Sequence, residues 1–353
     1  MCFHFVRQLD EMDRLSERWR QVHDADPHAS VFSSWGWVRG WCEATANPWV
    51  MVVAGHEAHR EPVAFLPLSL HWDPRRLWGA TYRLVPAGFP FADEASLVCA
   101  PEHEHAALGT LAEGVTALVD RTGAGRMEVR EAADPRWNEL IDRLEGPRFA
   151  LRWEENTARP FIPLPDDWET YLKGSKKRKA LLRRAEEAGN FVTHTTGPTL
   201  EHDMDRFLEL HQLRLGEKPP AYLDMMRSLL RWSFRTECLY MITLWSEEGD
   251  PTAMNVAFLD PARKRFHAYN GGWDEWYRDV SPRRVAELYS IRWAIEHGYR
   301  TYDFGRGGEP YKFGFGAEEG SNANAMLVRR ALSSVRRMAQ RLPTALGQGQ
   351  PGA

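Results

Sequence analysis

The chain carries the stretch YDFGRGGEPYKFGFG at residues 302–316, and a predicted strand over 301–304 leads into it. Its five glycines permit tight turns and let a ligand approach the backbone closely. The same stretch supplies groups that move protons or stabilise charge, namely Asp303, Arg306, Glu309, Tyr311 and Lys312. A segment needed only for folding rarely combines both features, so we expect the chemistry of the protein to lie here.

The residues around this stretch alternate between helical and extended patterns. In the second half, apolar residues at helical spacing, caps and helix-ending residues predict helices over 166–188, 200–215, 221–234 and 282–298. Short apolar runs predict strands over 191–195, 238–244, 252–259, 265–270, 301–304 and 325–328. The first half has a similar order, and a proline-rich segment separates the two. We therefore predict two α/β domains, at residues 1–158 and 159–335, and a flexible tail at residues 336–353.

Composition excludes several classes of protein. The formal net charge of −4 argues against general attraction to DNA or to an anionic membrane, and no apolar run approaches the length of a membrane span of ~18 residues. The cysteines form no CxxC pair and have no histidine at ligand spacing, so neither a metal site nor a disulfide framework is predicted. A cytoplasmic protein without a metal cofactor is the simplest expectation.

Several segments together resemble a known family. They are FSSWGWVRGW at 32–41, AFLPL at 64–68, SPR at 281–283, IRWAIEHGYR at 291–300 and the stretch at 302–316. They are similar to the GNAT-type acetyltransferases related to the cellulose-biosynthesis protein CelD, which are distant relatives of the FemAB aminoacyltransferases. The resemblance covers roughly residues 30 to 330. It implies tandem GNAT-like domains of the α+β class, with mixed, mainly antiparallel sheets flanked by helices.

The resemblance also implies an enzyme that transfers an acyl group. The simplest form moves an acetyl group from acetyl-CoA, or another acyl group from its acyl-CoA, to an amine of a small molecule, a sugar or a polysaccharide precursor. The amine would attack the thioester directly, because no cysteine or Ser-His arrangement indicates a covalent intermediate. Aminoacyl transfer from tRNA, as in the FemAB relatives, and a non-catalytic GNAT-like scaffold remain alternatives.

The donor is expected at the start of the helix over 282–298, where free N–H groups and the helix dipole suit a pyrophosphate. GNAT domains usually have Arg/Gln-x-x-Gly-x-Gly/Ala there, whereas this chain has RDVSPR at 278–283. This departure leaves a carrier-protein thioester or an aminoacyl-tRNA open as the donor. The residues predicted to hold the donor are Asn270, Gly271, Arg278, Ser281, Arg283 and Arg284.

Catalytic roles follow from a second motif. FemAB relatives have Phe-Lys-x-Gly-Phe-Gly, and this chain has YKFGFG at 311–316, so the resemblance makes Lys312 the group that stabilises the oxyanion. Glu309 is the preferred general base, and Asp303 is a second candidate with a more structural character. Tyr311 and Tyr277 are candidates for the acid that protonates the leaving thiolate, with Tyr277 also a substrate contact. Arg306 is expected to hold an anionic acceptor or the donor phosphates.

A basic run occupies residues 173–184, with seven cations in twelve residues. It could attract a nucleotide-sugar, a lipid-linked phosphate or tRNA, or it could be a solvated helix face. The family carries a basic helix here, and Arg178 matches its most regular arginine, so Arg178 is a predicted substrate contact.

Overall fold

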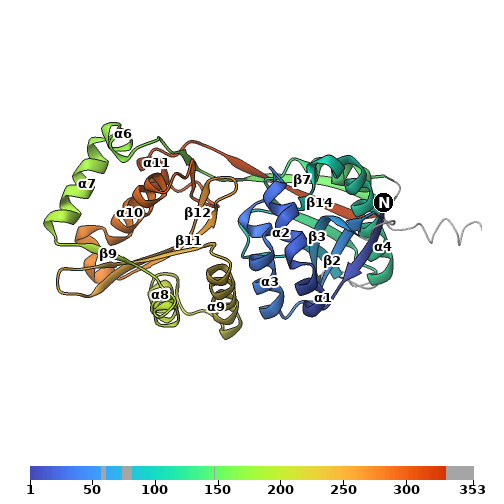
Figure 1. Ribbon diagram of the computed structural model, residues 1–353, viewed down its shortest axis with the longest axis horizontal. Helices are drawn as coiled ribbons and strands as arrows, with labels where there is room; N and C mark the ends of the chain where they lie inside the picture. Colours follow the sequence, from blue (N-terminus) through green and yellow to red (C-terminus); the bar gives the residue numbers. More distant parts are fainter. Residues whose placement is uncertain (57–60, 74–81, 147, 331–353) are drawn as a thin grey trace, which may run out of the picture.

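Two β-sheets, each flanked by helices, make up the computed structural model (Figure 1). The structure describes residues 1–56, 61–73, 82–146 and 148–330. Both sheets are mainly antiparallel, so the predicted mixed α+β class is confirmed. The tail predicted at 336–353 lies outside the described residues. Within the described ranges, no helix is long and apolar enough to cross a membrane.

The first sheet has the strand order β1-β2-β3-β4-β6-β14-β7, with β5 paired to β3. The strands are β1 (Cys2–Val6), β2 (Trp49–Gly55), β3 (Pro62–Trp72), β4 (Tyr82–Pro86), β5 (Val98–Cys99), β6 (Arg126–Ala132), β7 (Phe149–Ala158) and β14 (Ser321–Arg329). Its helices are α1 (Leu9–Arg14), α2 (Ser16–Ala25), η1 (Val31–Ser33), α3 (Trp35–Ala44), η2 (Pro101–His103), α4 (Glu104–Thr122) and α5 (Arg136–Leu144). Among the described strands of this sheet, β4 and β6 run parallel while the other neighbours are antiparallel.

The second sheet has the order β8-β13-β12-β11-β10-β9. Its strands are β8 (Phe161–Pro163), β9 (Phe191–His194), β10 (Leu239–Trp245), β11 (Pro251–Asp260), β12 (Arg265–Trp273) and β13 (Thr301–Asp303). The helices are α6 (Trp168–Lys173), α7 (Lys176–Glu187), α8 (Leu200–Leu215), α9 (Pro220–Arg235), η3 (Glu275–Val280), α10 (Pro282–Glu296) and α11 (Pro310–Gly314). In Figure 1, α8 and α9 cover one face of this sheet, and α10 with α6 and α7 covers the other.

The last strand belongs to the first sheet. The sequence places a strand over 325–328 in the second domain, but β14 lies between β6 and β7 of the first sheet. That assignment was wrong, because a strand's pairing partners are set by tertiary packing and not by its position in the chain. The boundary at 158/159 otherwise stays a prediction. The chain thus crosses between the two sheets twice, once before β8 and once before β14.

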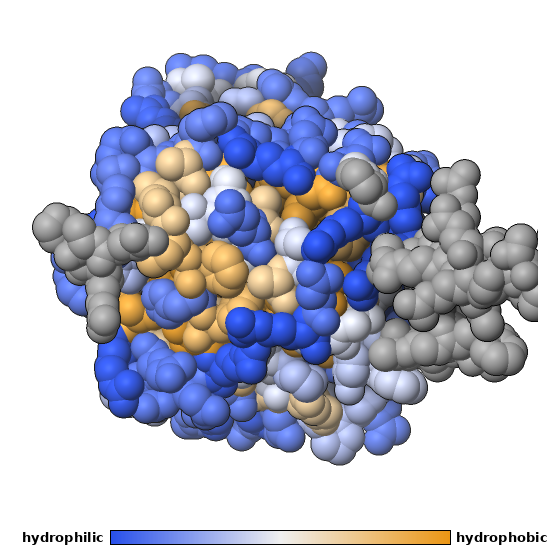
Figure 2. Space-filling view, turned by 90° about the vertical axis from the view of Figure 1, so that its right-hand side faces the viewer, coloured by the Kyte–Doolittle hydropathy of each residue, from blue (hydrophilic) through white to orange (hydrophobic). Residues whose placement is uncertain are grey.

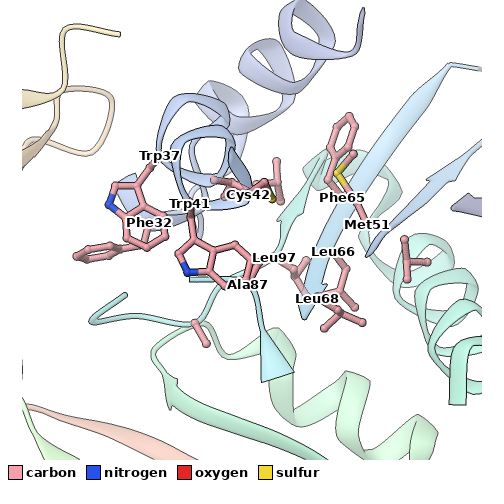
Figure 3. Close-up of a cluster of buried hydrophobic side chains, with 14 of the residues drawn as sticks. Phe32, Trp37, Trp41, Cys42, Met51, Phe65, Leu66, Leu68, Ala87 and Leu97 are labelled. Carbon is pink, nitrogen blue, oxygen red and sulfur yellow. The ribbon is translucent and has the colours of Figure 1, made fainter. Parts of the chain in front are cut away.

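A shared core ties the two halves together. The larger hydrophobic cluster runs from the first sheet to the α8 and α9 face of the second sheet. Its first-sheet part includes Trp37 and Trp41 of α3, and in Figure 3 Trp37 lies beside Phe32 while Trp41 lies nearer the β3 side chains. Helix α9 approaches α3 closely, since a Cβ added at Gly40 would lie 2.9 Å from the Trp232 side chain. The two halves therefore pack as one body of apolar residues.

The end of the molecule farthest from the second sheet carries a partly hydrophobic surface. Figure 2 shows this face, where hydrophobic side chains gather inside a border of hydrophilic ones. Helix α4 lies at this end of Figure 1, and a hollow of about 620 Å³ beside it is lined partly by Phe3, Ala112 and Ala117. This hollow is far from the stretch at 302–316 and plays no part in the site described next.

Candidate active site

Strands β12 and β13 diverge and open a notch in the second sheet. They pair in parallel only from Arg265↔Thr301 to His267↔Asp303, after which β12 continues while the chain turns away at Gly305, whose φ is +65°. Strand β12 also carries a bulge at Tyr269, since Ala257 faces Ala268 whereas Val256 faces Asn270. A bulge locally breaks the ladder and re-aims side chains, which is common beside functional sites.

A cavity of about 180 Å³ lies in this notch, and we call it the notch cavity. Side chains from β11, β12, α8, α10 and α11 enclose it. Its lining is Arg214, Asn255, Val256, Ala257, Phe266, Ala268, Tyr269, Asn270, Gly271, Arg283, Glu287, Ser290, Tyr302, Phe304, Arg306, Glu309, Tyr311 and Lys312. Of the residues predicted from the sequence, the structure brings together Asn270, Gly271, Arg283, Arg306, Glu309, Tyr311 and Lys312.

The ammonium of Lys312 is buried in the wall of the notch cavity. Its Nζ donates to the backbone oxygens of Arg306, at 2.8 Å, and Gly307, at 2.7 Å. It also lies 2.9 Å from Oε2 of Glu309, which is itself 56% exposed. An ammonium has three donors, so these three contacts engage all of them. Lys312 thus fixes the turn that leads into α11 and keeps a positive charge beside the cavity.

Glu287 is a buried carboxylate that the sequence reasoning missed. It projects from α10 into the notch cavity and accepts a hydrogen bond of 2.6 Å from the Tyr302 hydroxyl. Burial raises the pKa of Glu287, although the Tyr302 bond and the nearby charges of Arg283 and Lys312 oppose the rise. A signal existed in the sequence, because Glu287 falls one turn before Ile291 on the predicted apolar face of its helix.

Glu309, the base predicted from the sequence, has a different environment. Partial burial would raise the pKa of Glu309, but the hydrogen bonds from Lys312 and from its own backbone N–H, together with the charges of Lys312 and Arg283, outweigh burial and lower it. Tyr311, next to it, has its pKa raised to about 12 by burial and by Glu287, so the phenol is protonated at neutral pH. The notch cavity therefore holds two carboxylates whose pKa values are shifted in opposite directions.

Two arginines meet at an aromatic ring on the edge of the notch cavity. The guanidinium carbons of Arg214 and Arg283 lie 4.3 and 4.9 Å from the centre of the Trp273 ring. Arg283 also stacks on Tyr311 at 3.7 Å, and Arg214 donates to the Gly271 oxygen at 3.1 Å. Burial and then the charge of Arg283 lower the pKa of Arg214. Among the described residues neither arginine forms an ion pair with a carboxylate, so together they suit an anion.

Arg214 comes from α8, some distance from the notch in the sequence, and the sequence reasoning missed it. A close contact puts α8 there, since a Cβ at Gly272 would lie 2.6 Å from the Leu210 carbonyl carbon. Only a glycine in β12 lets the helix approach this far. No pattern within α8 marks Arg214 apart from the other arginines of the chain.

Arg306 links the notch cavity to the first half of the chain. Its Nε donates to Asp93 at 2.6 Å, and its Nη2 donates to the Pro90 oxygen at 2.8 Å. Asp93 is thus the ion-pair partner of Arg306, and the role predicted for Arg306 in holding an anionic acceptor or the donor phosphates stays a prediction. The pairing depends on the packing of the two halves, which local sequence does not reveal.

Asp303 lies outside the notch cavity in a buried ionic cluster. Arg159 pairs with both Asp303 and Glu94, and the Gly305 N–H donates to Asp303 at 2.8 Å. Burial opposes the shift, but Arg159 keeps the pKa of Asp303 low. His267 completes a group of three potential metal ligands with Glu94 and Asp303. The Arg159 guanidinium already lies between the two carboxylates and offsets part of their charge. The absence of a metal cofactor stays a prediction.

The remaining predicted residues also lie outside the notch cavity. The guanidinium of Arg178 packs over the Tyr171 ring at 4.2 Å and donates to the backbone oxygen of Tyr171 at 2.8 Å, which holds α7 against α6. Tyr277 donates to Asp250 at 2.8 Å, and Arg278 and Arg284 are exposed. Ser281, which was predicted to hold the donor, precedes α10 with φ +54°, and its side chain makes no capping hydrogen bond.

Comparisons with known proteins agree with this architecture. Residues 173–313 match the acetyltransferase (GNAT) domain family, and a search of curated proteins found no match. The fold is similar to the crystal structure of FemX, with TM-score 0.65 and 11% identity over 97% of this chain and 100% of that chain. It is also similar to L-PGS from Bacillus licheniformis, with TM-score 0.56 and 11% identity over 94% of this chain and 95% of that chain.

A third similar structure is the C-terminal domain of a putative lysylphosphatidylglycerol synthetase from Agrobacterium fabrum. The TM-score is 0.56 and the identity 10%, over 94% of this chain and 95% of that chain. At such identities these structures show a shared fold. With the family match to the segment that contains the notch, they lead to one conclusion: residues 173–313 form a GNAT acetyltransferase-like domain.

Proposed function

We propose that the protein is an N-acyltransferase that works in the notch cavity. The donor is a phosphate-bearing acyl thioester, most simply acetyl-CoA or another acyl-CoA, and the acceptor is an amine. The observation that supports this best is the combination of groups at one opening in the sheet. Two arginines that have no carboxylate partner among the described residues suit the donor phosphates, and a buried carboxylate with a raised pKa also lines the cavity.

Donor binding would use Arg214 and Arg283 in place of the usual glycine-rich loop. Both guanidiniums are planar and already stacked on aromatic rings, so little freedom is lost when they bind a phosphate. The first turn of α10 begins at Pro282, next to Arg283, and adds the positive end of the helix dipole. The acyl chain would enter along β12 beside Asn270 and Gly271.

The reaction would be a direct attack. The amine nitrogen forms a bond to the thioester carbonyl carbon, and the C–S bond of the tetrahedral intermediate then breaks to give the amide and a thiolate. We propose that Glu287, rather than Glu309, removes the proton from the amine, because a carboxylate with a raised pKa is the better base near neutral pH. Tyr311 would return a proton to the thiolate, and the positive charge of Lys312 would favour the oxyanion.

Loss of the two arginines is expected to weaken donor binding. Replacing Arg283 or Arg214 by Gln removes one charged hydrogen-bonding group from the phosphates, which corresponds to roughly tenfold or more in Kd for each arginine. Calorimetry with CoA and acetyl-CoA measures this. Arg292→Gln is the matched control, since Arg292 lies on the same helix but pairs with Glu296 at the surface.

The same titrations test the proposed function itself. If neither acetyl-CoA nor longer acyl-CoAs bind to the wild-type protein, while a tRNA or a carrier protein does bind, the acyl-CoA proposal is wrong. If nothing binds and no amine is acylated, the non-catalytic scaffold becomes the better account.

Aminoacyl transfer from tRNA is a second candidate, supported by the surface of α7. The exposed cations of this helix are Lys176, Lys177, Lys179, Arg183 and Arg184. Of these, Arg183 pairs with Glu187 on the same helix. A tRNA bound by such a surface would release counterions, so its affinity would fall steeply with salt.

The triple variant Lys176→Gln, Lys177→Gln, Lys179→Gln distinguishes the two candidates. For a tRNA donor, we expect weaker tRNA binding and a shallower dependence of log Kd on log salt, by roughly two to three units of slope for three phosphate contacts. A filter-binding series in KCl measures it. For a CoA donor, acetyl-CoA affinity should be unchanged, because these lysines do not line the notch cavity. The closer kinship to the CelD-related group stays a prediction.

A further inference from the structure

A second hollow adjoins the notch cavity at the junction of the two halves. It measures about 300 Å³ and is lined by Pro90, Phe91, Asp93, Tyr222, Tyr269, Asn270, Phe304 and Arg306. Half of this lining, from Tyr269 to Arg306, also lines the notch cavity, so the two hollows meet along β12 and the turn after β13. We call it the aromatic hollow. It requires the two halves to be packed together, because Phe91 follows β4 and Tyr222 lies on α9.

The tyrosine hydroxyls of the aromatic hollow are already engaged. Tyr269 donates to the backbone oxygen of Phe91 at 2.9 Å. The Tyr222 hydroxyl lies 3.0 Å from Nε2 of the buried His211. Phe91 and Tyr222 form a tilted pair with ring centres 5.3 Å apart, and both are half-buried. These tyrosines and Phe91 therefore offer a ligand mainly the surfaces of their rings.

The two charged side chains of the hollow are paired with each other. Asp93 and Arg306 bind each other, and the Pro90 oxygen accepts from Arg306. Apart from this pair and the two tyrosines, Asn270 is the polar side chain of the described lining. An amino sugar would bring several hydroxyls here, and each hydroxyl left without a partner costs binding free energy. An aromatic ring has no such requirement and can stack or pack edge-on against these walls.

We propose that the aromatic hollow binds the acceptor of the acyl transfer and selects a primary amine that carries an aromatic ring. The ring lies among Phe91, Tyr222 and Phe304, and the amine reaches the notch cavity past Asn270, where the two hollows meet. This inference rests on the proposed function, since it names the acceptor class for the same site.

Binding of tyramine, glucosamine and hexylamine to the wild-type protein tests the inference, by calorimetry without donor. We expect tyramine to bind most tightly. Tyr222→Ala should weaken tyramine binding roughly tenfold or more, as truncation of a central interface aromatic does, whereas Tyr222→Phe keeps the ring and should retain the affinity. Phe191→Ala is the control for removal of an exposed aromatic ring, because Phe191 lies on β9, outside both hollows.

CoA affinity of each variant is measured in parallel and shows whether the notch is intact. Equal or tighter binding of glucosamine, or unchanged tyramine affinity in Tyr222→Ala, overturns the acceptor class while leaving the acyl-transfer proposal in place. The reverse result, tyramine binding that depends on Tyr222 with no binding of CoA, supports the hollow and contradicts the acyl-CoA donor.

Discussion

Glu287→Gln is expected to lower turnover by about 10²–10⁴-fold, the usual contribution of a positioned general base. Glutamine has nearly the same shape and can still accept the hydrogen bond from Tyr302, so the fold of α10 and the affinity for CoA should change little. Steady-state rates with acetyl-CoA and a saturating amine, alongside CoA titration, measure the two effects separately. The loss should appear in kcat and not in donor affinity.

The pH dependence gives a second test of the same residue. The base must be ionised, and burial raises the pKa of Glu287 above its ordinary value, so wild-type turnover should rise with pH through that raised pKa. This limb should be absent from the residual activity of Glu287→Gln. Glu309→Gln is the matched comparison, because Glu309 has a lowered pKa and is the base predicted from sequence. If Glu309→Gln loses more turnover than Glu287→Gln, the assignment of the base is wrong.

The contribution of Glu287 to folding stability should fall as pH rises, whereas its contribution to activity should grow. A raised pKa means that the folded state holds the proton of Glu287 more tightly than the unfolded state does. This contribution is fully present below the ordinary glutamate pKa and is lost as pH rises through the raised value. The free energy of unfolding of Glu287→Gln, relative to wild type, should therefore increase between pH 4 and neutral pH. Denaturant unfolding at the two pH values measures the difference.

Lys312→Ala is expected to depress turnover by about 10²-fold or more, which is the effect of removing one group that stabilises an oxyanion. The structure adds a second consequence, since the ammonium also holds the Arg306 and Gly307 oxygens. Losing these charge-assisted bonds should lower the free energy of unfolding by roughly 1.5–3 kcal/mol for each bond that water does not replace. Kinetics and denaturant unfolding of the same variant separate the two effects.

The split between kcat and KM identifies how Lys312 acts. Stabilisation of the oxyanion by the positive charge, which acts only in the transition state, lowers kcat and leaves the acceptor KM unchanged. A purely positioning role, through the turn that carries Arg306 toward the aromatic hollow, raises the acceptor KM instead. Unchanged turnover in a folded Lys312→Ala variant would remove Lys312 from the mechanism.

Much of the fold was predictable because local patterns determine it. The order of helices and strands in each half follows from apolar spacing, caps and glycines, and these features reflect short-range preferences. The stretch at 302–316 was also predictable as part of the site, since glycines and ionisable groups rarely alternate in a passive turn. Four of its five named ionisable residues line the notch cavity, and the fifth, Asp303, lies in the cluster with Arg159.

The rest depends on contacts between distant segments. Arg214 reaches the notch only because α8 packs closely against Gly272, and Asp93 reaches Arg306 only because the halves pack together. Strand β14 joins the first sheet for the same kind of reason. Glu287 is a different case, since its sequence position on an apolar helix face was visible. A carboxylate there is costly unless it is protonated or partnered, and this conflict marks functional positions.

The most direct test of the account is the release of the free CoA thiol from acetyl-CoA, followed with a thiol reagent in the presence and absence of an amine. The account predicts that thiol release requires the amine and that one amide forms for each thiol released. It also predicts that release is strongly reduced in Glu287→Gln, although this variant still binds CoA. Two results would contradict it. One is thiol release that does not depend on the amine. The other is no release from acetyl-CoA with any amine, while the protein does transfer an acyl group from an aminoacyl-tRNA or a carrier-protein thioester.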